Sequence, residues 1–257
     1  RLAASEEGDG KPGFHTSVAR NAILLLPASN YMEQAVWLLE VLTSIQPARF
    51  FVVFIDPTLT ALQCAIGERV VETGSGEKIK SEVVRVAIPA KFEHFLPHVL
   101  RPLLIAGVES DLFLVRCGEI PRALIEMSAS LADRMIFDSA ETEQGLIQAA
   151  RMLGTPLKLV DLNWLRLSAW KDQIRNSFSR HSLQRQISKI SAVTLRYRGG
   201  EQPPGSVLLL AGWTTEKMGL SIAAYGNSQY ECLGRIGTIV ALKFEKECDG
   251  SETLSEV

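Results

Sequence analysis

The 257-residue sequence lacks the short motifs that mark the most familiar active sites. No G-x-G-x-x-G follows the apolar runs that end at Leu26 and Ile55, and no G-x-x-x-x-G-K-[ST] occurs anywhere, so the usual phosphate cradles of nucleotide sites are missing. No G-x-S-x-G occurs either, which removes the commonest setting of a hydrolase serine. The sequence therefore predicts no cofactor, no catalytic residues and a protein that is not an enzyme.

Metal ligands are also scarce. The cysteines form no C-x-x-C pair, which argues against a zinc site and against a dense set of disulfides. There are four of them: Cys64, Cys117, Cys232 and Cys248. His94 and His98 have the spacing of two ligands on one helix, but Pro97 lies between them and no third ligand is evident. We expect no metal centre, and we expect the cysteines to be reduced, small, buried side chains.

Long apolar runs and an excess of charge are absent as well. No stretch approaches the roughly 18 apolar residues that cross a bilayer, and the net charge of −2 gives no overall attraction to nucleic acid. Hydrophobic residues make up 46% of the chain and charged residues 22%, the proportions of a globular protein. We expect a cytoplasmic protein with neither membrane nor nucleic acid as a partner. The polar segment 1–13 and the acidic tail 247–257 are expected to be disordered.

The first half of the chain has the pattern of a layered α/β domain. Residues 21–26 and 50–55 are continuous apolar runs, typical of strands buried on both faces, and residues 31–45 between them repeat apolar side chains at helical intervals. Residues 61–72 and 79–88 flank a Gly-Ser-Gly turn and predict an antiparallel hairpin. Helices are expected at 92–105, 122–131 and 143–153, and strands at 111–115 and 134–137. We expect an N-terminal α/β domain with a mixed sheet over residues 14–154.

A break at Gly154-Thr155-Pro156 separates this domain from a smaller α+β domain over residues 155–246. A strand at 157–160 and one continuous helix at 161–178 begin this domain. A helix at 206–218, closed by Gly219, precedes three strands near 220–226, 229–235 and 237–244, which predict an antiparallel meander. Gly212, beside Trp213, suggests that another backbone approaches this helix closely.

Polar residues follow two of the predicted strands. Asp138 and Ser139 come after one, and Asp161 and Asn163 come after the next. Ligand groups often lie at the carboxyl ends of strands in α/β sheets, so these four side chains are candidates for a sugar-phosphate site in an enzyme or sensor. The alternative interpretation is that they cap the helices that follow. The sequence supplies no nearby partner for proton transfer, which favours capping.

The segment 161–178 is the most distinctive part of the chain because it combines Trp164 and Trp170 with several cations. Either both indoles are core side chains, or one of them is a contact anchor beside Arg166 or Lys171. Residues 166–198 carry eight Lys or Arg against one Asp, a net charge of +7. Such a segment forms either an ordinary solvated face or a surface for an acidic partner.

Three sequence blocks carry a family resemblance: DRMIFDSAE at 133–141, DLNWLRLSAW at 161–170 and LLLAGWTTEKMG at 208–219. Together with RNAILLLP at 20–27 and PARFFVVFIDP at 47–57, they resemble the glucose-6-phosphate dehydrogenase assembly proteins, the OpcA family. One departure is Arg116-Cys117-Gly118, where aromatic residues are common in that family.

The resemblance implies a non-catalytic accessory subunit of the oxidative pentose phosphate pathway. Such a subunit binds, assembles and allosterically activates glucose-6-phosphate dehydrogenase, which would be the protein partner of this chain. An activator of this kind acts through its differential affinity for two states of its partner and needs no active site. The candidate contact residues are Trp164, Arg166, Trp170 and Arg175.

Overall fold

A computed structural model describes residues 14–15, 18–72, 74, 76, 78–140, 157–179, 186–198, 202–226, 229–234 and 238–247. The predicted disordered segment 1–13, the helix at 143–153, the domain boundary at 154, Cys248 and nearly all of the tail lie outside these residues. The described residues form two compact units. Unit 1 contains the described residues up to Phe137 together with residues 157–160. Unit 2 contains residues 138–140 and the described residues from Asp161 onward.

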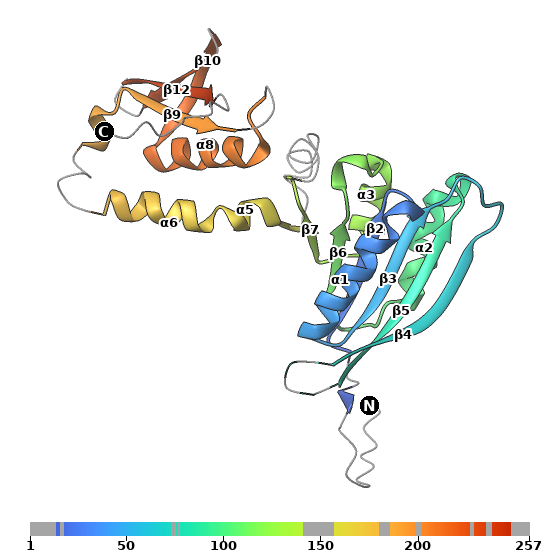
Figure 1. Cartoon of the computed structure of the whole chain (residues 1–257). Coiled ribbons are helices and arrows are strands. Elements are labelled where there is room, and N and C mark those ends of the chain that lie inside the picture. Colours follow the sequence, from blue (N-terminus) through green and yellow to red (C-terminus); the bar gives the residue numbers. More distant parts are fainter. Residues whose placement is uncertain are drawn as a thin grey trace, which may run out of the picture. The chain divides into compact units, whose positions relative to one another are not determined.

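Unit 1 is built on a mixed sheet whose order is β1-β5-β3-β2-β6-β7-β8, with β4 paired to β5 (Figure 1). Its strands are β1 (Phe14–His15), β2 (Arg20–Leu26), β3 (Ala48–Ile55), β4 (Gln63–Glu72), β5 (Lys78–Ile88), β6 (Ser110–Leu114), β7 (Arg134–Phe137) and β8 (Lys158–Asp161). β2 pairs in parallel with β3 and β6, and β4 pairs antiparallel with β5. The predicted β-α-β unit, the hairpin and the mixed sheet are confirmed. The order reverses between β2 and β6, as in doubly wound sheets.

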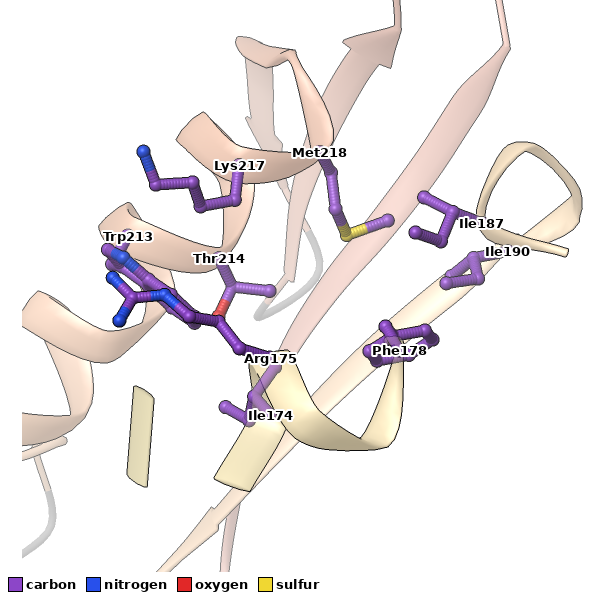
Figure 2. A pocket seen from close by; sticks show the side chains of 9 residues that line it. All are labelled: Ile174, Arg175, Phe178, Ile187, Ile190, Trp213, Thr214, Lys217 and Met218. Atoms are coloured by element: carbon purple, nitrogen blue, oxygen red, sulfur yellow. The ribbon is translucent and has the colours of Figure 1, made fainter. Parts of the chain in front are cut away.

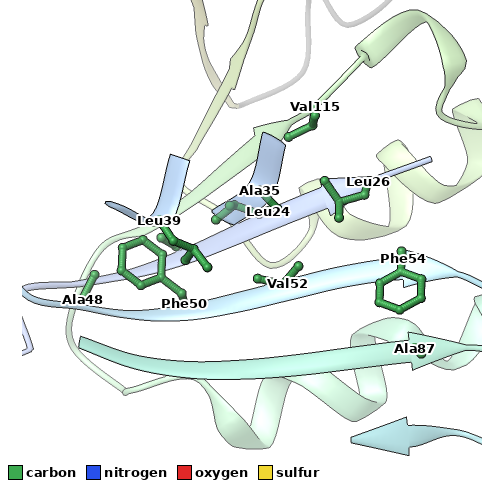
Figure 3. Packing of buried hydrophobic residues seen from close by; sticks show 11 residues of the cluster. Leu24, Leu26, Ala35, Leu39, Ala48, Phe50, Val52, Phe54, Ala87 and Val115 are labelled. Carbon is green, nitrogen blue, oxygen red and sulfur yellow. The ribbon is translucent and has the colours of Figure 1, made fainter. Parts of the chain in front are cut away.

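The core of unit 1 explains why β2 and β3 are almost wholly apolar. Leu24 and Leu26 of β2, with Phe50 and Phe54 of β3, pack beneath α1 (Met32–Ile45) (Figure 3). On the other face of the same strands, Phe51 and its neighbours are equally buried. Both faces of a central parallel strand are covered, so nearly every position must be apolar. Each such side chain contributes roughly 1.5–3 kcal/mol through burial.

The segment predicted as one helix at 92–105 is instead three short turns. They are the 3₁₀ helix η2 (Ala90–Phe95), the α-helix α2 (Leu96–Leu100) and the 3₁₀ helix η3 (Arg101–Leu103). Pro97 and Pro102 each fall in the first turn of the short helix that contains them. Proline fits there and breaks a helix interior, which is why a continuous helix does not form. The remaining helical elements of unit 1 are η1 (Ser29–Tyr31), η4 (Cys117–Glu119) and α3 (Arg122–Ala129).

Unit 2 has a four-stranded sheet in the order β10-β11-β12-β9. Its strands are β9 (Ala192–Tyr197), β10 (Leu220–Gly226), β11 (Gln229–Gly234) and β12 (Ile239–Lys246). The last three form the predicted antiparallel meander, and β9 joins β12 in parallel. Helix α8 (Gly205–Met218) covers one face, with Ala211 packed against Cys232, Val240 and Leu242. The predicted fold class, an α/β domain followed by a smaller α+β domain, is confirmed.

The prediction of one continuous helix at 161–178 is wrong. The segment forms α5 (Leu162–Arg166) and α6 (Ser168–Ser177), joined at Leu167, which has φ −75° and ψ −1°. Leu167 is buried while Leu165 and Trp170 are exposed. The apolar spacing therefore does not follow one helical stripe. Ser168, a residue that favours helix ends, follows the break.

Helix α8 ends as predicted, with Gly219 at φ 67° in the left-handed conformation that glycine tolerates best. On this helix Trp213 is buried, whereas Leu208 is partly exposed. The interpretation that Gly212 permits a close backbone approach is wrong, because a Cβ at this position would meet no atom within 4 Å. Gly212 is an interior helical residue with free space around it.

We therefore predict that Gly212→Ala stabilises unit 2 by about 0.5–1 kcal/mol, since alanine loses less backbone entropy on forming the helix. Gly234→Ala is the contrasting variant, because a Cβ there would lie 2.5 Å from Thr238 Oγ1 and should lower stability. Urea unfolding followed by circular dichroism measures both. A loss of stability in Gly212→Ala would contradict the described packing.

Candidate functional site

The four strand-end polar residues lie together in unit 2. The Asp161 carboxylate accepts hydrogen bonds from the Ser139 backbone N–H (3.1 Å), the Ser139 hydroxyl (2.7 Å) and the Asn163 backbone N–H (3.0 Å). The Asn163 side-chain amide donates to Ser139 Oγ at 3.0 Å. The Asp138 carboxylate accepts from the Ala140 N–H (3.0 Å) and pairs with both terminal nitrogens of Arg166 (2.8 and 2.5 Å).

This polar cluster consists of groups that satisfy one another. Asp161 caps α5 through the Asn163 N–H, as the capping interpretation predicts. Ser139 and Asn163 are buried, and each donates to another member of the cluster. Arg166, proposed from the sequence as a partner contact, is held by Asp138. The arrangement joins the first residues of unit 2 after β7 to the start of α5. A ligand at this cluster would have to displace internal hydrogen bonds.

The remaining three contact candidates occupy different environments. Trp164 is half-buried, and the Lys171 ammonium lies 3.6 Å from its ring centroid and donates to its carbonyl oxygen at 3.2 Å. Burial lowers the pKa of this ammonium, with a further contribution from the nearby Arg175 cation. Trp170 is 59% exposed, which is unusual for an indole. Arg175 lies over the Trp213 ring at 5.6 Å and pairs with Asp172 at 2.8 Å.

A groove of about 180 Å³ lies beside Arg175 (Figure 2). Helix α6, helix α8 and the 3₁₀ helix η5 (Ile187–Lys189) provide most of its walls. The lining residues are Ile174, Arg175, Phe178, Ile187, Ile190, Trp213, Thr214, Lys217 and Met218. We call this feature the Trp213 groove. Its lining is almost wholly apolar, and its volume is below the roughly 300–1,000 Å³ of small-molecule pockets.

The basic segment 166–198 is partly neutralised in space. The parallel register of β9 and β12 places Arg196 opposite Glu245, and the two side chains pair at 3.1 Å. Arg198 pairs with Glu247 at 2.9 Å. Two acidic residues near the end of the sequence, Glu245 and Glu247, thus offset two cations of the basic segment, Arg196 and Arg198. Among the described cations of the segment, Arg175 lines the Trp213 groove.

A second polar cluster, in unit 1, lies at the carboxyl ends of β2 and β6, where the strand order reverses. Tyr31 donates a short hydrogen bond to Glu119, and Arg116 pairs with the same carboxylate at 2.5 Å. Arg116 has φ 55°, the only positive φ of a non-glycine residue among those the structure describes. Backbone strain of this kind costs energy and is often found at functional positions. These three groups are already paired with one another.

The hydrogen bond from Tyr31 lowers the pKa of Glu119, with the Arg116 guanidinium adding to the effect. Folding thus favours the carboxylate: its contribution to stability is present above its unfolded pKa and is lost as the pH falls through the lower folded pKa. We predict that Tyr31→Phe raises the pKa of Glu119 toward its ordinary value. An NMR titration of the Glu119 side-chain carboxyl measures this, and an unchanged titration in the variant would contradict the described geometry.

Several other sequence expectations concern single residues. Within the described parts of the chain, no group of three or more His, Cys, Asp or Glu side chains is placed to hold a metal ion. Cys117 and Cys232 are buried, as expected, and burial raises the pKa of the Cys232 thiol. Cys64 is exposed, so the expectation of burial is wrong for it. In the same residues, no helix has the length and apolar character needed to span a membrane.

Sequence reasoning missed the Trp213 groove and the second polar cluster, formed by Tyr31, Arg116 and Glu119, which we call the Tyr31 cluster. Helical spacing places Lys217 one turn after Trp213, so part of the groove was visible in the sequence. Ile187 and Ile190 come from a separate element, and only the fold brings them to α8. The Tyr31 cluster requires the strand order, which places the segment after β2 beside the segment after β6.

The fold and these sites define a class of protein: a two-unit α/β protein whose unit 2 presents an exposed tryptophan and an apolar groove beside cations. Residues 157–252 match a family model described as the C-terminal domain of a glucose-6-phosphate dehydrogenase subunit. A putative OxPP cycle protein OpcA from Synechocystis sp. is 26% identical over 130 residues, covering 49% of this chain and 27% of the relative. A putative OxPP cycle protein OpcA from Synechococcus elongatus is 22% identical over 150 residues, covering 57% and 32%.

These matches confirm the resemblance to the OpcA family that was seen in the sequence. The family model covers most of unit 2, including the Trp213 groove and, from the strand-end polar cluster, Asp161, Asn163 and Arg166. The matched regions span about a third or less of the curated relatives, at 27% and 32% of their lengths.

Proposed function

We propose that this chain is a non-catalytic accessory subunit that binds glucose-6-phosphate dehydrogenase and favours its assembled, more active state. The match of residues 157–252 to the model of a glucose-6-phosphate dehydrogenase subunit domain supports a role connected with that dehydrogenase. The observation that carries the proposal is the exposure of two large side chains of α6, because Trp170 and the Arg175 side chain are each 59% exposed. Tryptophan and arginine are the residues most enriched in the energetic centres of protein interfaces.

The four candidate contacts contribute differently under this proposal. Trp170 and Arg175 would contact the partner directly, because Trp170 is exposed and the ion pair of Arg175 with Asp172 is exposed on both sides, whereas Arg166 pairs with the largely buried Asp138. Trp164 of α5 would stabilise the position of α6, because the Lys171 ammonium of α6 lies over its ring. Arg166, the last residue of α5, would hold this helix to Asp138 through their ion pair. Neither polar cluster has to perform chemistry for this function.

Activation requires that the chain bind one state of the dehydrogenase more tightly than another. A preference of tenfold in affinity supplies about 1.4 kcal/mol of coupling, which is enough to shift a balanced assembly equilibrium strongly. The effect on the dehydrogenase is therefore expected to saturate as the accessory chain is added, with no turnover by the accessory chain alone.

Co-purification with the dehydrogenase of the same organism tests this function. We expect a stable complex on size-exclusion chromatography and initial rates that change with added chain at several concentrations of glucose 6-phosphate. Trp170→Ala should weaken the complex, while Trp37→Ala, at a similarly exposed tryptophan of α1 in unit 1, should not. Absence of a complex together with unchanged kinetics would refute the proposal.

A second candidate function, a sugar-phosphate-binding enzyme or sensor, has one observation in its favour: Asp138, Ser139, Asp161 and Asn163 do converge. Arg166 beside Asp138 could then hold a phosphate. Calorimetric titration with glucose 6-phosphate distinguishes the two candidates. Saturable binding that is lost in Arg166→Ala would favour this one, and no heat of binding would favour the accessory role.

A further inference from the structure

Resting on the proposed function, we infer that the Trp213 groove is the docking subsite for an acidic peptide segment of the dehydrogenase that carries a protruding apolar side chain. The groove is lined almost wholly by carbon atoms of six apolar residues: Ile174, Phe178, Ile187, Ile190, Trp213 and Met218. At about 180 Å³, its volume suits one inserted side chain better than a whole metabolite.

The groove has two unlike ends (Figure 2). At one end, the Arg175 guanidinium lies against Trp213, and the Lys217 side chain extends from the next turn of α8. At the other end, the lining side chains Met218, Ile187 and Ile190 lie near one another and are all apolar. Because one end is charged and the other is apolar, we expect the occupant to bind in one orientation. The inserted apolar side chain belongs at the Met218 end and the carboxylate at the Trp213 end.

Charge complementarity selects an acidic occupant. The three helical elements that line the groove, α6, η5 and α8, contain three exposed cations against two carboxylates, a net charge of +1 once Lys171, which is buried against the Trp164 ring, is left out. The cations are Arg175, Lys189 and Lys217, and the carboxylates are Asp172 and Glu216. The pairs Arg175–Asp172 and Lys217–Glu216 are exposed, so each holds its cation weakly and leaves it available to a partner carboxylate.

The groove is continuous with the exposed face of α6. Trp170 precedes Ile174 by four residues, so the two side chains lie on the same face of the helix, one turn apart. Trp170 therefore extends the apolar surface beyond the mouth of the groove. An aromatic anchor beside a small pocket with charged edges is the arrangement of an energetic centre in a protein interface.

Charge reversal at the rim provides the test. Arg175→Glu and Lys217→Glu should each weaken binding to the dehydrogenase by about tenfold or more, because each places a carboxylate opposite the acidic segment. The control is Arg122→Glu on α3, an exposed helical arginine that is also paired with an acid one turn away. It should change the dissociation constant by less than about twofold. Biolayer interferometry measures the constants, and circular dichroism confirms that each variant is folded.

A photo-crosslinking amino acid in place of Thr214, which lines the groove, provides an independent measurement. We expect it to capture a dehydrogenase peptide in which a Leu, Ile or Phe lies within a few residues of Asp or Glu. Capture of a basic peptide, or no capture in a complex that forms, would overturn the inference.

The two proposals fail differently. If the unaltered chain binds the dehydrogenase while the rim variants bind equally well, the groove is not the subsite and the proposed function stands. If the unaltered chain forms no complex, the proposed function fails and this inference fails with it. Binding of a free apolar carboxylate such as decanoate, with no effect of the rim variants on the protein complex, would assign the groove to a small ligand instead.

Discussion

Phe51→Ala is expected to lower the free energy of unfolding of unit 1 by about 3–5 kcal/mol, because it leaves a cavity in a strand that is buried on both faces. Phe51 is fully buried in β3, where partial collapse of the neighbouring strands would disturb the pairing with β2 and β5. Guanidinium unfolding followed by circular dichroism measures the loss. A typical domain is stable by only about 5–15 kcal/mol, so the variant approaches global instability.

Phe95→Ala is the matched control for this prediction. Phe95 lies in η2 of the same unit and is 47% exposed, so the identical substitution removes little buried area and should cost less than about 1 kcal/mol. Equal losses in the two variants would contradict the position of β3 at the centre of the sheet.

Asp161→Ala is expected to cost unit 2 about 2–4 kcal/mol, the second large effect. The variant removes the acceptor of three hydrogen bonds, from the Ser139 N–H, the Ser139 hydroxyl and the Asn163 N–H, and it removes the cap of α5. Ser139 is buried, and donors left without partners in a buried site carry the full cost of desolvation. The loss is measured by urea unfolding monitored through tryptophan fluorescence, to which Trp164 at the adjacent α5 contributes.

Asp172→Ala is the control for Asp161, because Asp172 forms one exposed ion pair with Arg175 and should contribute well under 1 kcal/mol. The same pair of variants also separates structure from function. If the polar cluster is structural, folded Asp161→Ala keeps its affinity for the dehydrogenase at low temperature. A loss of affinity without a loss of stability would indicate that the cluster binds a ligand or the partner.

Much of the fold follows from local sequence. The strands at 21–26 and 50–55 could be predicted because a central parallel strand must be apolar at nearly every position. The meander at the end of the chain was visible because three short strands of similar length are separated by turns. Gly219 marked the end of α8 because a left-handed residue is needed there.

Other features depend on contacts that local sequence does not encode. The break between α5 and α6 depends on Leu167, whose burial is decided by packing. The pairing of Arg196 with Glu245 requires the parallel register of β9 and β12, and these strands are separated by two intervening strands and a helix. The basic segment therefore suggested more free positive charge than the described residues show.

The candidate site was predictable only in part. Trp170 and Arg175 could be named from the sequence, because an aromatic residue beside cations is typical of interfaces. Sequence alone did not separate them from Trp164 and Arg166, which carry the same chemistry but are held by Lys171 and Asp138. The groove depends on the approach of η5 to α8, a contact between segments that are distant in sequence.

The central claim is that this chain acts by binding the dehydrogenase through unit 2 and favouring one assembly state. Mass photometry of the dehydrogenase, with increasing amounts of the chain, measures that claim directly. The account predicts a saturable shift toward the larger assembly, with the chain bound, and a shift that needs several times more protein when Trp170 is replaced by alanine. A mass distribution that stays unchanged at a large excess of the folded chain would contradict it.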